Sequence, residues 1–89
     1  MSKTGMTELT SLRNIGKEME KKLKSVDIMD AEELKRVGSE EAFIRLKFRY
    51  PEVCLVHLYA LEGAVTDTEY DQLDEAVKQR LKEFNDRLK

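Results

Sequence analysis

The segment from residue 11 to residue 37 constrains the fold of this chain more than any other. Its apolar side chains recur every three or four positions, at Ile15, Met19, Leu23 and Val26. This spacing places them on one face of a helix over residues 17–26. A short helix precedes it and ends near residue 14, and Gly16 between the two permits a tight turn. The segment therefore predicts a helix-hairpin-helix.

Start and stop signals predict two more helices after the hairpin. Asp30, with Glu33 three residues later, forms a capping box for a helix that runs to residue 37. Gly38 is a suitable terminator for that helix. A further helix follows over residues 39–50, where Pro51 stops it. Its apolar stripe is Ala42, Phe43, Leu46 and Tyr50.

The second half of the chain predicts a central helix and a final amphipathic one. Residues 53–62 are apolar on nearly every side, which is typical of a helix enclosed by others, and Gly63 is expected to end it. Tyr70, in the polar connection that follows, is expected to fold back onto the core. The last helix begins near residue 73, and its expected buried stripe is Leu73, Val77, Leu81, Phe84 and Leu88.

These patterns together predict an all-α fold with no strands. We expect a compact bundle of five to six short helices, with the helix-hairpin-helix in its N-terminal half. Residues 1–7 are expected to be a flexible tail, and residues 8–89 a single domain. At 89 residues, such a domain buries only somewhat more than about 60% of its unfolded surface, so its stability margin is modest.

Composition and charge narrow the function. The chain has no apolar run near the roughly 20 residues of a membrane span, so no membrane partner is expected. A single cysteine and the absence of an apolar signal-peptide core point to the cytoplasm. Net charge is −2, divided as +2 over the first 50 residues and −4 over the rest. This balance argues against avid non-specific binding of nucleic acid and leaves room for a local basic patch.

The hairpin is the one place where the sequence suggests contact with an anion. A glycine turn at a helix start can direct backbone N–H groups toward a phosphate. The interleaved Glu18 and Glu20 leave open the plainer interpretation of a solvated, mixed-charge helix face. The residues predicted for contact with DNA phosphates are Arg13, Asn14, Ile15, Gly16, Lys17 and Lys21.

The remaining residues predict no catalytic site, no metal site and no cofactor. Cys54 and His57 lie three positions apart, as a metal pair or a nucleophile–base pair would. Neither the ligands of a tetrahedral metal site nor a third orienting group accompanies them. We therefore expect Cys54 to be buried and structural. The aromatic residues, Phe48 included, are expected to belong mostly to the core rather than to a surface that stacks bases.

Several motifs resemble the C-terminal domain of the TfoX/Sxy competence regulators. The resemblance rests on residues 9–16, Ile28, residues 30–34, Val37-Gly38 and Glu41-Ala42, and most specifically on the Leu-Tyr-Ala-Leu-Glu-Gly-Ala string of residues 58–64. It covers residues 8–84 and implies an all-α fold with a link to DNA uptake and natural transformation. Typical members carry an N-terminal α/β domain for which 89 residues leave no room, so a freestanding domain is expected. DNA-binding hairpins usually have two glycines, and here Asn14 replaces the first.

The expected function is therefore binding rather than catalysis. The first hypothesis is a protein–protein adaptor in competence or transcriptional regulation, with a protein partner in a regulatory complex. The alternative is weak, non-specific binding of double-stranded DNA phosphates through Asn14-Ile15-Gly16. A monomer or a weak homodimer is expected in either case.

Overall fold

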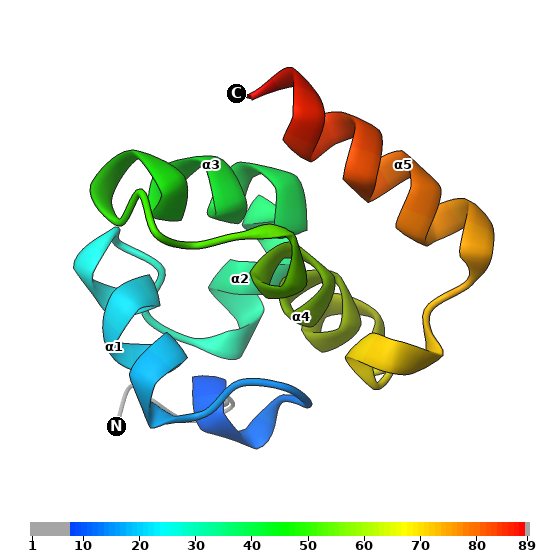
Figure 1. Cartoon of the computed structure of the whole chain (residues 1–89). Helices are drawn as coiled ribbons and strands as arrows, with labels where there is room; N and C mark the ends of the chain where they lie inside the picture. Colours follow the sequence, from blue (N-terminus) through cyan, green and yellow to red (C-terminus); the bar gives the residue numbers. More distant parts are fainter. Residues whose placement is uncertain (1–7, 89) are drawn as a thin grey trace.

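The computed structural model describes residues 8–88 and is all-helical over that range, which confirms the predicted fold class (Figure 1). The expected tail of residues 1–7 lies outside the described residues. Five α-helices and two 3-10 turns make up the described part: η1 (Leu9–Ser11), α1 (Lys17–Ser25), α2 (Ala31–Val37), α3 (Ser39–Arg49), α4 (Leu55–Thr66), η2 (Tyr70–Gln72) and α5 (Glu75–Arg87). None of these helices is long and apolar enough to cross a membrane.

Asp30 caps α2 as predicted, but only the first half of the expected capping box forms, because Glu33 binds the backbone N–H of Met29 and not that of Asp30. The Asp30 carboxylate accepts a hydrogen bond from the Glu33 backbone N–H at 2.9 Å, and Glu33 accepts one from the Met29 backbone N–H at 3.3 Å. The first of these bonds satisfies an N–H group that a helix start leaves without a partner, and the second fixes the residue that precedes the cap. Gly38, with φ of 91°, separates α2 from α3. Only glycine adopts this backbone conformation readily.

α4 lies at the centre of the fold and packs against α3, η2 and α5 (Figure 1). Leu58 and Leu61 are fully buried, as the prediction of a central helix requires. The expectation of complete enclosure is wrong on one side, where Val56 is 45% exposed. The helix begins two residues later than predicted, at Leu55. It also ends later, because Gly63 lies inside it and the left-handed Asp67, with φ of 57°, ends it.

α5 lies along the outside of the bundle and packs on α4 (Figure 1). Leu81 is fully buried and Leu73 nearly so, whereas Leu88, the residue after the helix, is 38% exposed and falls outside the buried part of the predicted stripe. A polar link joins the three last helices. Arg80 lies 3.4 Å from Glu62 of α4, which also accepts a 2.5 Å hydrogen bond from the buried Ser39 hydroxyl of α3.

Candidate functional site

The hairpin turn lies between η1 and α1, and its special backbone position is Asn14 rather than Gly16. Asn14 has φ of 69°, in the left-handed region, which asparagine tolerates better than most residues. Gly16 has φ of −95° and ψ of −175°, an extended conformation open to any residue. A Cβ added to Gly16 would meet no atom within 4 Å. The expectation that Gly16 provides the tight turn is therefore wrong.

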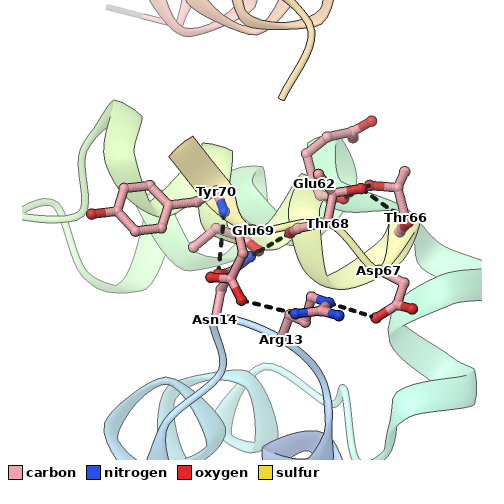
Figure 2. A network of polar contacts seen from close by, with 9 residues as sticks. Arg13, Asn14, Glu62, Thr66, Asp67, Thr68, Glu69 and Tyr70 are labelled. Carbon is pink, nitrogen blue, oxygen red and sulfur yellow. Dashed lines mark hydrogen bonds and ion pairs between the residues drawn. The ribbon is translucent and has the colours of Figure 1, made fainter. Parts of the chain in front are cut away.

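The Asn14 side chain ties the hairpin to the segment that follows α4 (Figure 2). Its amide nitrogen donates to the backbone carbonyls of Ala60, at 3.3 Å, and Thr68, at 3.0 Å. Its amide oxygen accepts from the Tyr70 backbone N–H at 3.3 Å. One partly buried side chain thus serves both as donor and as acceptor for groups far away in the sequence.

Gly63 makes this approach possible. A Cβ on Gly63 would collide with the Asn14 side-chain nitrogen and with the Thr68 carbonyl oxygen. The Thr68 backbone N–H donates to the Gly63 carbonyl at 2.8 Å, so the chain returns closely over this glycine. Gly63 was predicted to end the helix; its role is instead to let two segments pass close to α4. We call the contacts of residues 13 and 14 with residues 60–70 the clasp.

Arg13 adds two ion pairs to the clasp (Figure 2). Its guanidinium lies 2.9 Å from Glu69 and 3.0 Å from Asp67. The hydrogen bonds with Glu69 and then Asp67, together with their negative charges, raise the pKa of the guanidinium above its ordinary value. The arginine that was predicted to meet DNA phosphates therefore already faces two carboxylates of its own chain.

The structure separates the six predicted contact residues into two groups. Arg13 and Asn14 point into the clasp, and the Ile15 side chain is buried in the core. Gly16, Lys17 and Lys21 lie exposed at the start of α1 and on its outer face. No side chain caps α1, and neither lysine forms an ion pair with any residue between 8 and 88.

A groove of about 350 Å³ lies beside this open group, between α1 and α4. Met19 and Lys22 line it from α1, and Val56 and His57 line it from α4. Tyr70 also lines it. The prediction that Tyr70 folds back onto the core is wrong, because its side chain is 44% exposed and only its backbone N–H takes part in the clasp.

Cys54 is exposed, which contradicts the prediction of a buried cysteine. The reason is that α4 begins at Leu55, so that Cys54 is the residue just before the helix instead of part of its apolar surface. The Cys54 backbone N–H donates to His57 Nδ1 at 3.0 Å, and the thiol lies 3.6 Å from the same nitrogen. The pair therefore caps α4. Between residues 8 and 88, no three histidine, cysteine or acidic side chains gather as metal ligands would.

Phe48 is one of the aromatic residues that were expected to belong mostly to the core, and the structure places it on the surface with 91% of its area exposed. A signal was present in the sequence. Phe48 falls outside the helical register of Phe43, Leu46 and Tyr50, which defines the buried stripe of α3.

This arrangement defines a small all-α, helix-hairpin-helix-like domain whose turn is held by a loop from its own second half. The chain belongs to the family described as the TfoX C-terminal domain, whose model matches residues 5–85. This confirms the resemblance found in the sequence.

Two solved structures have the same fold. A triclinic crystal form of an uncharacterized protein from Listeria monocytogenes has a TM-score of 0.90 and 46% sequence identity, with 92% of this chain and 93% of that chain covered. A tetragonal form of a protein of unknown function from Listeria monocytogenes has a TM-score of 0.87 and 46% identity, with 90% and 99% covered. No curated protein matches the chain.

Proposed function

We propose that this domain is a non-enzymatic regulatory module that binds a protein partner in a competence-related pathway. Membership of the TfoX C-terminal domain family supports the regulatory role. The observation that carries the proposal is the clasp, in which Arg13 and Asn14 are engaged by residues 60–70.

The clasp favours a protein partner because it lowers the positive potential at the hairpin. A turn that binds phosphate needs free N–H groups and nearby cations. Here Asp67 and Glu69 lie beside the turn and neutralise Arg13. The surface instead offers large apolar side chains, of the kind that interfaces use. Those with 40% or more of their area exposed are Met29, Ile44, Phe48, Val56 and Tyr70.

The Cys54–His57 pair supports a non-catalytic role. His57 Nδ1 accepts the Cys54 backbone N–H, so the nitrogen nearest the thiol is already occupied as an acceptor. A general base needs a free acceptor directed at the proton it removes. The pair is therefore better suited to starting α4 than to nucleophilic chemistry.

The test is affinity capture with cross-linking from a naturally competent host, using the wild-type domain and a Lys21→Glu variant. We expect the same protein partner to be recovered with both, and its recovery to survive nuclease treatment. Recovery that depends on intact nucleic acid, and that Lys21→Glu abolishes, would contradict the adaptor function.

The open group of hairpin residues favours a second candidate, weak binding of DNA phosphates. Gly16 leaves the first N–H groups of α1 uncapped, and the helix dipole favours an anion there. Lys17 and Lys21 are exposed nearby without ion pairs among the described residues. Such binding would fall with salt, with a slope of about −0.9 per phosphate contact for duplex DNA.

An NMR titration with a short duplex at low salt tests this second candidate. DNA binding predicts shifts of the amides of residues 14–17, and weaker binding by Lys21→Glu. The matched control is Lys35→Glu, which makes the same charge change at an exposed position of α2. If these amides stay unshifted at about millimolar DNA, where non-specific binders are normally saturated, the hairpin does not bind DNA.

A further inference from the structure

The C-terminal end of α3 exposes an aromatic side chain that has no role in the fold. Phe48 is 91% exposed, whereas Phe43 of the same helix is fully buried. Beside Phe48 lies a groove of about 380 Å³ between α3 and the end of α1, lined by Ser25, Val26, Arg45, Phe48 and Arg49. We call these five residues the α3 patch.

The α3 patch carries two positive charges, of which one, on Arg45, is paired with a carboxylate among the described residues and the other, on Arg49, is not. Arg45 is occupied, since it lies 3.1 Å from Glu41 and donates to the Val26 carbonyl at 3.2 Å. Arg49 forms no ion pair with any described residue. Its guanidinium rests over the Tyr50 ring, 5.7 Å from the centroid, and Lys22 lies 5.3 Å from the same centroid.

The helix dipole explains the basic residue at the end of α3 but not the exposed phenylalanine beside it. Basic residues are favourable in the last turn of any helix, so Arg49 alone would need no further explanation. The dipole gives no reason for a phenylalanine in water. Phenylalanine and arginine are both enriched at protein interfaces relative to the rest of the surface.

From the proposed adaptor function, on which this step rests, we infer that the α3 patch binds an acidic, amphipathic segment of the partner protein. An apolar side chain of that segment occupies the groove against Phe48 and Val26, and its carboxylates meet Arg49. Such a pairing of apolar anchor and complementary charge gives both affinity and orientation.

A protein segment fits the α3 patch better than single-stranded nucleic acid does. Base stacking along a strand needs successive open aromatic faces. Phe48 is the one aromatic residue of the patch, and the ring of the neighbouring Tyr50 lies under Lys22 and Arg49.

The test is an NMR titration of the labelled domain with synthetic peptides. The probe is a twelve-residue peptide of glutamate and leucine arranged as an amphipathic helix. Two matched peptides replace every glutamate with lysine or every leucine with serine. We expect the first peptide alone to shift the amides of residues 25–26 and 45–49. A response to the lysine peptide of equal size would overturn the inference.

Variants of the domain sharpen the result. Phe48→Ser and Arg49→Glu should each weaken binding of the acidic peptide by about tenfold or more, as loss of a hot-spot residue does. Met29→Ser and Lys35→Glu make the same kinds of change at exposed positions elsewhere and should leave affinity unchanged. Circular dichroism will show whether all four variants keep the wild-type fold.

The capture and titration experiments distinguish an error about the α3 patch from an error about the adaptor function. If the captured protein partner is retained by both Phe48→Ser and Arg49→Glu, the patch is overturned and the adaptor function stands. If no protein is captured and a single-stranded oligothymidine shifts residues 45–49 while the acidic peptide does not, both are overturned. Loss of the partner with these two variants and not with the two controls supports both.

Discussion

The clasp and the α3 patch both place arginines next to a turn, and they use them in opposite ways. Arg13 is held between Asp67 and Glu69 and helps to fix a loop. Arg49 rests on an aromatic ring of its own helix end and meets no described carboxylate. The residues of the clasp bind other parts of the same chain, whereas Phe48 and Arg49 of the patch face solvent. The comparison teaches that a basic residue near a helix end indicates a binding site only when its own chain leaves it unpaired.

The largest expected effect concerns Phe43, the buried phenylalanine of α3. Phe43→Ala should lower the free energy of unfolding by about 3–5 kcal/mol, because it opens a cavity in a fully buried site. Chemical denaturation with urea measures this loss. A cost below about 1 kcal/mol would show that α3 is held in place by something other than its buried face.

Gly63→Ala should follow, with a loss at the upper end of the roughly 1–3 kcal/mol typical of overpacking. The added methyl group meets a backbone carbonyl, which cannot rotate away as a flexible side chain could. The matched control is Gly16→Ser, where a Cβ meets nothing and a serine can cap α1. Urea midpoints compare the two, and equal losses would mean that the close approach over Gly63 is not tight.

Asn14→Gly should cost about 1–2 kcal/mol, because it keeps the left-handed backbone and removes three hydrogen bonds. Asn14→Ala should cost about 1 kcal/mol more, through backbone strain. The double variant Asn14→Gly, Gly63→Ala should lose less than the two single losses combined, because one collision disappears with the asparagine. Strict additivity in a thermodynamic cycle would contradict direct contact between the two sites.

The smallest effect is expected at the α3 patch. Phe48→Ala should change the free energy of unfolding by less than about 0.5 kcal/mol, since exposed side chains contribute little to folding. Thermal denaturation beside the Phe43→Ala variant makes the contrast visible in one experiment. A loss above about 1 kcal/mol would assign Phe48 to the fold and remove it from the list of interface residues.

Local patterns were enough to predict most of the fold. Apolar spacing located the buried faces of α1, α3 and α5, and the Asp30–Glu33 pair fixed the start of α2. Such signals involve residues a few positions apart, and a sequence displays them directly. The family motif at residues 58–64 was also visible.

The clasp could not be predicted, because its chemistry depends on distant segments. Asn14 and Gly63 each had a plausible local role, as a turn residue and as a helix terminator, and those local roles hid their mutual contact. Cys54 was misplaced by a shift of two residues in the start of α4. A boundary error of this size is common, and for a residue next to a helix start it decides between burial and exposure.

The clasp also has a consequence for the order of folding. Its hydrogen bonds join residues 46 to 56 positions apart, so they close loops that contain α1, α2, α3 and either the first half or the whole of α4. Contacts of such separation are made after local ones, because the chain entropy of closure must first be offset. Asn14→Gly should therefore speed unfolding and leave the folding rate nearly unchanged in stopped-flow experiments. We therefore expect the clasp to form last, after the helices have packed together.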